Sequence, residues 1–357
     1  MQKNAFHSSV EGAQHGPKGL AGFAAYAKQS GAFGLQPSNY MVTRDDGSLF
    51  KASEIREVME QNGLVLNGIS RHCPFWLHGS LWTGTRSGNL FVHPSWLGTD
   101  GHPDVQKIED YLIRLFDLDA ELDLHTAPMF WGQYHGPELA GGYPWGFWTG
   151  PNFGEQAKTA PQFDLLAEGD ERFVTKTARL RSEAVSRAIR ICHEIHPGTG
   201  AQCADDFLHL VKITDNCKSN GVNADGSHCW EGEGWEDRFT KVGPWIYAAH
   251  IKDFKRVPGA ALRSMIPGWP DRGMRFTLLG QGEVSMLGYA ELLIKVGYLA
   301  RYCAAHKTAS APLVVEAESA HVQLDTASAH GIKYVNDNLT WPVAEGSFEK
   351  GMGAAEK

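Results

Sequence analysis

Short apolar segments alternate with longer segments of helical periodicity along most of this chain. In 52–62, for example, Ile55, Val58 and Met59 fall on one helical face. Strands are expected at 6–10, 31–36, 64–70, 122–126, 189–194, 221–225, 246–250 and 312–316. Helices are expected at 18–30, 52–62, 103–118, 170–189, 201–218, 235–243 and 286–305. Because strands that alternate with helices form parallel sheets, the pattern predicts an α/β fold, a (β/α)8 TIM barrel.

A doubly wound open sheet is the alternative architecture, but no glycine-rich phosphate loop follows the first strand. We expect one barrel domain over 1–336 with two long loops, at about 130–168 and 254–283. The stretch 337–357 is rich in Gly, Glu and Lys and is expected to form a loose tail.

Composition narrows the class of protein. The 357 residues are 42% hydrophobic and 21% charged, which supports a globular core rather than disorder. No apolar run approaches the roughly 18 residues of a membrane helix, and the first residues lack a signal-peptide pattern. The net charge of −8 argues against a nucleic-acid surface. Six scattered cysteines without a CxxC pair predict neither a disulfide framework nor a thiolate zinc site, so a reduced, cytoplasmic protein is expected.

Aromatic and histidine residues are frequent in the predicted loops. The chain has 11 Trp and 16 His, and many Trp lie beside Gly or Pro, as in 143–148. Such rings either offer flat surfaces to a sugar or pack the long loops. His72 in 71–74 and Trp131 in 131–135 are the best cleft candidates of the N-terminal half. Further histidines there either line the cleft or lie in loops: His7, His125 and His135.

The last four predicted strands each run into a side chain that could bind a metal ion. These side chains are Glu194, Asp225, His250 and Glu316. Because catalytic groups of parallel barrels lie at the carboxyl ends of the strands, the four are expected to form a metal site. An oxygen-rich set with one imidazole suits Mn²⁺ best, with Mg²⁺, Co²⁺ or Zn²⁺ as alternatives. The alternative interpretation is that these polar residues simply begin loops.

Neighbouring residues extend this predicted site. His196 points to the same side of its strand as Glu194, and Lys252 to the same side as His250. Lys252 either stabilises an oxyanion or, as we prefer, braces a carboxylate. Glu318 shares a side with Glu316 and is the alternative ligand.

The C-terminal half resembles the xylose-isomerase-like barrel superfamily of sugar isomerases and epimerases. The resemblance lies in five stretches that occur in order over about 185–320. They read HEIHPG at 193–198, DGSH at 225–228, HIKD at 250–253, RGMRF at 272–276 with GQG at 280–282, and VEAE at 315–318. The N-terminal half matches only in the rhythm of its elements.

This resemblance implies a divalent-metal site formed by Glu194, Asp225, His250 and Glu316. It also implies that Glu194 and Glu316 act as general acid and base, while His228 and Arg275 hold sugar oxygens. The expected reaction removes a proton next to the carbonyl of a keto sugar, in isomerisation or epimerisation. The cation would stabilise the enolate as its charge develops. Elimination by a 3-oxo-glycoside lyase, like the catalytic subunit of a C-glycoside deglycosidase, is the alternative.

Two other functions are less favoured. An abasic-site endonuclease shares this barrel but needs more histidine ligands and a basic groove, which the net charge opposes. A non-catalytic accessory barrel is opposed by the complete set of ligand-type residues.

The expected binding partner is a small sugar or glycoside. Neither a nucleic acid nor a membrane is expected as a partner. A homo-oligomer or a partner subunit is compatible with the sequence.

Overall fold

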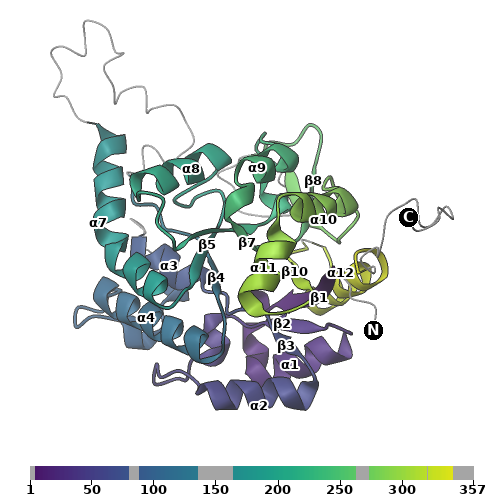
Figure 1. Ribbon diagram of the computed structural model, residues 1–357, viewed down its shortest axis with the longest axis horizontal. Coiled ribbons are helices and arrows are strands. Elements are labelled where there is room, and N and C mark those ends of the chain that lie inside the picture. Colours follow the sequence, from purple (N-terminus) through teal and green to yellow (C-terminus); the bar gives the residue numbers. More distant parts are fainter. Residues whose placement is uncertain (1–4, 80–87, 136–163, 263–272, 320, 341–357) are drawn as a thin grey trace, which may run out of the picture.

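The computed structural model describes residues 5–79, 88–135, 164–262, 273–319 and 321–340. Its centre is a sheet of eight parallel strands that curls into a (β/α)8 TIM barrel, as predicted (Figure 1). In sheet order the strands are β3 (Val65–Leu66), β2 (Gly34–Gln36), β1 (Phe6–Glu11), β10 (Ala311–Val315), β7 (Ile246–Ile251), β6 (Asn220–Ala224), β5 (Arg190–Glu194) and β4 (Thr126–Met129). The carboxyl ends of all eight strands therefore lie at one end of the barrel.

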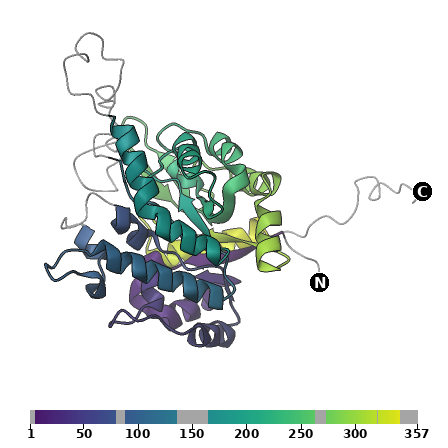
Figure 2. The ribbon, with the colours of Figure 1, turned by 60° about the vertical axis from the view of Figure 1, so that its left-hand side comes forward.

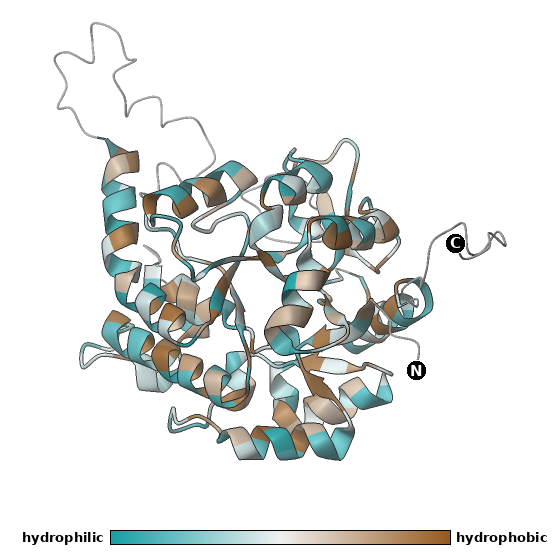
Figure 3. Ribbon diagram, in the orientation of Figure 1, coloured by the Kyte–Doolittle hydropathy of each residue, from teal (hydrophilic) through white to brown (hydrophobic). Residues whose placement is uncertain are grey.

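Helices surround the sheet, as two views of the ribbon show (Figures 1 and 2). They are α1 (Gly19–Gln29), α2 (Ala52–Asn62), α3 (His72–Gly79), α4 (Val105–Glu121), α7 (Leu165–Ser186), α8 (Ala204–Ile213), α9 (Trp235–Lys241), α10 (Met286–Lys295), α11 (Tyr298–His306) and α12 (Leu324–Asn338). Brown and teal residues alternate along the outer helices in Figure 3. In α4, for example, Ile108, Leu112 and Leu115 are buried, as expected for an amphipathic helix.

The two edge strands of the sheet, β3 and β4, are joined outside the ladders. Within the described residues they share no strand pairing, but Arg71 N–H donates to Pro128 O at 2.9 Å. The Arg71 guanidinium forms a completely buried, two-point ion pair with Asp119 of α4, at 2.7 and 2.8 Å. This pair ties the segment after β3 to the helix that precedes β4.

Two predicted strands differ from the structure. The segment 64–70 forms only the two-residue strand β3, and the chain turns at Gly68, where φ is +118°. Val65 of β3 is exposed. The segment 122–126 is not the fourth strand, since Leu122 and Leu124 instead donate backbone hydrogen bonds into the last turn of α4. Asp123, at φ +59°, completes this helix end, and β4 begins at Thr126.

Other differences concern segments without a clear period. The predicted loop 254–283 contains an antiparallel hairpin of β8 (Asp253–Arg256) and β9 (Met274–Thr277). The predicted helix 286–305 is divided into α10 and α11 at Gly297, where φ is +84°. Helices α3 and α12 were not predicted. Most of the predicted loop 130–168 and of the tail 337–357 lies outside the described residues.

None of the helices in the described part of the chain is both long and apolar enough to cross a membrane.

Candidate metal and active site

Four neighbouring strands of the barrel, β5, β6, β7 and β10, bring the four predicted ligands together. Glu194 is the last residue of β5, and Asp225 directly follows β6. His250 is the next-to-last residue of β7, and Glu316 directly follows β10. One donor atom from each of the four lies within 4.8 Å of every other. This proximity follows from the parallel register, in which His250 pairs with Val314 of β10.

Two amide side chains, those of Gln36 and Asn223, form hydrogen bonds to members of this set. Gln36, the last residue of β2, accepts a hydrogen bond at 2.7 Å from Nε2 of His250. Nδ1 of His250 therefore faces Glu316 Oε2 at 3.1 Å and Glu194 Oε2 at 3.3 Å. Asn223 of β6 donates to Glu194 Oε2 at 2.8 Å. Such contacts orient ligand atoms before a cation binds.

Lys252 supplies a buried positive charge at the same place. Its Nζ lies 3.2 Å from Asp225, 3.0 Å from Glu316 and 2.9 Å from Glu318. It also lies 4.7 Å from the centre of the Phe276 ring. Glu318 is 36% exposed whereas Glu316 is 9% exposed, so Glu316 is the inner carboxylate of the two.

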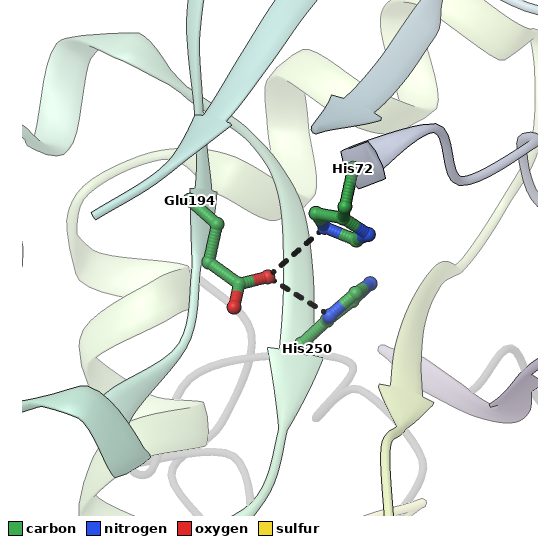
Figure 4. A group of neighbouring side chains, drawn as sticks. All are labelled: His72, Glu194 and His250. Carbon is green, nitrogen blue, oxygen red and sulfur yellow. Dashed lines mark ion pairs between the residues drawn. The ribbon is translucent and has the colours of Figure 1, made fainter. Parts of the chain in front are cut away.

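Three histidines surround Glu194. Figure 4 shows His72, from the start of α3, and His250, from β7, converging on Glu194 of β5. His72 Nε2 lies 3.4 Å from Glu194 Oε2, and His228 Nε2 lies 3.1 Å from Oε1. The His196 ring lies beside that of His228, with centroids 4.0 Å apart.

These contacts keep the carboxylates ionised although burial opposes it. Burial would raise the pKa of Glu194, but hydrogen bonds from the surrounding histidines lower it well below its ordinary value. Burial likewise opposes ionisation of Glu316 and Asp225, yet the Lys252 charge lowers the pKa of both. Burial would lower the pKa of His250, but Glu194 and Glu316 outweigh it and raise the value to about 10.

A cavity of about 350 Å³ opens above this set. Its polar lining includes Glu194, Glu316, Glu318, Lys252, His72 and His196. Asp225 and His250 lie beneath it, and their side chains are completely buried. A small molecule in the cavity would therefore meet two of the four donors directly.

The donor set fits a divalent cation. Three carboxylates and one imidazole whose Nδ1 is directed inward are the ligand types that Mn²⁺, Mg²⁺ or Co²⁺ accept. Two further groups of donors share Glu194, one with His72 and His250 and one with His196 and His228.

Two predicted substrate contacts, Trp131 and Arg275, are not among the described residues that line this cavity. Trp131 is 4% exposed and packs edge-on against Phe75 and Phe173, so its ring belongs to the core. The preceding residue, Phe130, lines the cavity instead. Arg275 lies on β9 beside His321, at 3.4 Å, and the alternation of that strand turns Phe276 toward Lys252.

The other histidines considered for the cleft also lie away from it. His7 is near the amino end of β1 and contacts Ser310 at 2.8 Å. His125 precedes β4 and lies beside His306. His135 contacts Asp170 of α7 at 2.9 Å and lines a different cavity, of about 330 Å³.

Sequence reasoning missed several polar residues of the site. Glu11 ends β1, is 1% exposed and accepts hydrogen bonds from Ser70 and from Ala13 N–H. Burial, with the Glu316 charge acting in the same direction, raises the pKa of Glu11 to about 7. Gln14 donates to Glu316 at 3.0 Å. The same strand-end signal that identified Glu194 would have identified Glu11 and Gln36.

Asp253 explains why the HIKD and GQG stretches occur together. Its carboxylate accepts backbone hydrogen bonds from Gly280, Gly282 and Val284 at 2.7–3.2 Å. A side chain at position 282 would collide with Asp253 and with Phe254 O, at 2.2 Å from an added Cβ. The turn 280–284 is thereby fixed beside Lys252.

The sequence matches a known protein family. The family model of the xylose isomerase-like TIM barrel matches residues 24–337 of this chain. No curated protein sequence matches the chain. A solved structure with a similar fold is the xylose isomerase domain protein of Planctomyces limnophilus, which is 16% identical in sequence. The superposition covers 93% of this chain and 97% of that protein, with a TM-score of 0.58.

Two further structures share the fold. A xylose isomerase-like TIM barrel protein of Mycobacterium smegmatis, in complex with magnesium, is 17% identical over 93% of this chain and 96% of its own, with a TM-score of 0.53. The 3-keto-D-glucoside 4-epimerase of E. coli is 11% identical over 93% of this chain and 99% of its own, with a TM-score of 0.54. Likeness at these identities shows the shared barrel.

Proposed function

Because the chain belongs to the xylose isomerase-like TIM barrel family, we propose that it is a divalent-metal-dependent enzyme that moves a proton next to the carbonyl of a keto sugar. The observation that carries this proposal is the convergence of Glu194, Asp225, His250 and Glu316 within 4.8 Å under a cavity. The magnesium complex and the keto-glucoside epimerase among structures with the same fold support it. We expect Mn²⁺ as the native ion, with Mg²⁺, Co²⁺ and Zn²⁺ as alternatives.

The chain would hold the cation through Glu194, Asp225, Nδ1 of His250 and Glu316. When bound, a divalent ion polarises a carbonyl oxygen and stabilises the negative charge that develops on it. Gln36 accepts from Nε2 of His250, so Nδ1 is the nitrogen that faces the carboxylates and that would bind a cation in exchange for its proton. Asp225, whose carboxylate also caps Ser227 N–H at 2.8 Å, is fixed in position before substrate arrives.

Glu194 and Glu316 are the proposed acid and base. Both line the cavity, and both have a lowered pKa, so each enters the reaction ionised and able to accept a proton from carbon. They extend from β5 and β10, with β6 and β7 between them, and so approach the substrate from two directions. One carboxylate would take the proton from carbon, and the other, after taking up a proton from water, would donate it to the opposite face of that carbon, which is the requirement for epimerisation.

His72, His196 and Lys252 are the proposed contacts to substrate oxygens, because all three line the cavity. Lys252 also braces Glu316 and Asp225, so it combines the two roles that its sequence position suggested. His228 is assigned to holding Glu194, with which it forms its shortest ion-pair contact.

The test combines metal content with proton exchange. Purified wild-type protein should contain about one divalent ion per chain, and Asp225→Asn should lose it, whereas the exposed control Glu57→Gln should keep it. Proton NMR in D₂O, with a panel of ketoses and 3-oxo-glucosides, should show deuterium uptake next to the carbonyl that Glu316→Gln abolishes. Metal-loaded protein that exchanges no proton on any member of the panel would contradict the proposal.

A further inference from the structure

A second cavity, of about 330 Å³, is lined by the loops that follow β4 and β5 and by the helices α7 and α8. It is here termed the α7–α8 cavity. Gln133 lines it from the first loop, Thr199 from the second, Leu166 from α7 and Asp206 from α8. It shares no described lining residue with the cavity of the proposed metal site. A ligand of the α7–α8 cavity is therefore separate from the substrate.

Asp170 of α7 holds two histidines of the α7–α8 cavity by their Nε2 atoms. Its carboxylate lies 2.9 Å from His135 Nε2 and 2.8 Å from His209 Nε2. Gly169 makes room for the first ring, since a Cβ at this position would lie 2.2 Å from His135 Cδ2. Because both Nε2 atoms are occupied, only the Nδ1 atom of each ring remains for a ligand.

This histidine pair is not arranged around a metal ion. Among the described residues, no group of three or more potential metal donors within 4.8 Å of one another includes His135 or His209. The ligand of this cavity is therefore sought among organic molecules.

Gln133 brings a buried amide without a partner to the α7–α8 cavity. It is 5% exposed, and its side chain forms no hydrogen bond to any described residue. Burying a polar group without a hydrogen-bond partner is unfavourable, and most buried side-chain polar atoms have one. Because Gln133 lines the cavity, a molecule bound there would supply the missing partner.

The charges around the α7–α8 cavity favour a cation. Asp206 is acidic, and none of the described lining residues is a lysine or an arginine. Asp170 adds a second carboxylate in contact with the histidine pair. The helix N-termini that would attract an anion are already capped, that of α7 by Asp164 and that of α8 by Glu233. A positively charged ligand is therefore favoured over a phosphate or a carboxylate.

Most polar groups that this cavity leaves for a ligand are hydrogen-bond acceptors. They are the Gln133 carbonyl oxygen, the Asp206 carboxylate and the Nδ1 atoms of His135 and His209. An ammonium group matches them, because it carries three N–H donors and no acceptor. Leu166 and Leu210, which also line the cavity, suit a short carbon chain.

We propose that the α7–α8 cavity binds a small alkylammonium ion. Gln133, Asp206 and the histidine pair accept hydrogen bonds from its N–H groups, and its carbon chain packs on the two leucines. This inference is independent of the proposed function, because it concerns a different cavity and requires neither metal nor turnover.

The test compares three probes of similar size by NMR titration of the isotope-labelled full chain. n-Butylammonium should bind with a Kd of about 1–10 mM and should shift the side-chain amide signals of Gln133. It should bind at least about tenfold more tightly than tetramethylammonium, which has the charge but no N–H group, and than n-butanol, which has no charge.

Substitutions locate the binding site. Asp206→Asn and Gln133→Leu should each weaken n-butylammonium binding at least about fivefold. The matched control is Asp205→Asn, on the neighbouring position of α8, where the carboxylate is 74% exposed and pairs with Lys241. This control should leave the affinity unchanged. Asp206 is exposed, so Asp206→Asn should fold even if Gln133→Leu does not.

Four results would overturn the inference. The first is equal affinity for n-butylammonium and tetramethylammonium, and the second is equal affinity for n-butylammonium and n-butanol. The third is the absence of any shift of the Gln133 side-chain signals at about 50 mM n-butylammonium. The fourth is an Asp206→Asn variant that binds as tightly as wild type or loses no more affinity than Asp205→Asn, which would show a general attraction of cations to an acidic surface.

Discussion

The buried ion pair between Arg71 and Asp119 is expected to govern the stability of the barrel where β3 meets β4. Both side chains are completely buried, and their nitrogen–oxygen distances are 2.7 and 2.8 Å. In Asp119→Ala the Arg71 guanidinium would keep its backbone contact to Ile69 O but lose its counter-charge. Leaving one buried charge unpaired costs about 3–5 kcal/mol, a large share of the roughly 5–15 kcal/mol by which domains are stable.

Urea denaturation followed by circular dichroism measures this change. The matched control is Asp117→Ala on the same helix, where the carboxylate is 54% exposed and pairs with Arg187 at 2.7 Å. An exposed pair of this kind contributes about 0–1 kcal/mol, so the control should shift the midpoint little. The double variant Arg71→Met/Asp119→Leu should recover most of the loss, because both charges are removed together. The reasoning is refuted if Asp119→Ala loses no more stability than Asp117→Ala.

Three further predictions concern a metal-orienting amide, a buried histidine and the turn beside the site. Gln36→Leu should weaken metal affinity about 10–100-fold in a chelator competition assay, while the exposed Gln106→Leu should not, and equal affinities would contradict the orienting role. Burial lowers the pKa of His7 from 6.5 to about 4, so the unfolded chain binds a proton first as the pH falls. The free energy of unfolding should therefore drop by about 2 kcal/mol more between pH 7 and 5 in wild type than in His7→Gln, and parallel pH profiles would refute this. Asp253→Ala removes the acceptor of three backbone N–H groups of the turn 280–284, so amide hydrogen exchange there should become faster, and unchanged exchange would contradict this role of Asp253.

The order of strands and helices could be predicted from the sequence because burial imposes a period. In 52–62 the apolar spacing and the final Gly63 predict the helix that the structure contains, with Gly63 at φ +64°. The predicted strand at 122–126 is wrong because burial alone does not distinguish the two conformations. Leu122 and Leu124 are apolar, and apolar residues suit the end of a helix as well as a strand. Periodicity reports that a residue is buried, and it does not report which backbone conformation buries it.

The candidate site was partly visible in the sequence, since a polar residue that ends an apolar strand lies at the carboxyl end of a parallel barrel. This rule located Glu194, Asp225, His250 and Glu316 without a structure. The same rule does not reach residues outside the eight barrel strands. Phe276 of β9, for example, lies 4.7 Å from Lys252 Nζ because β9 pairs with β8, which directly follows Lys252.

What the sequence by itself determined is therefore the barrel and the polar side chains at its strand ends, because both follow from local periods of burial. Only the tertiary structure decided which groups surround that chemistry. Gln36 contacts His250, 214 positions away, and Gln14 contacts Glu316 across 302 positions. Contacts between distant segments depend on how the barrel closes, and no local pattern of hydrophobic and polar residues encodes their distances.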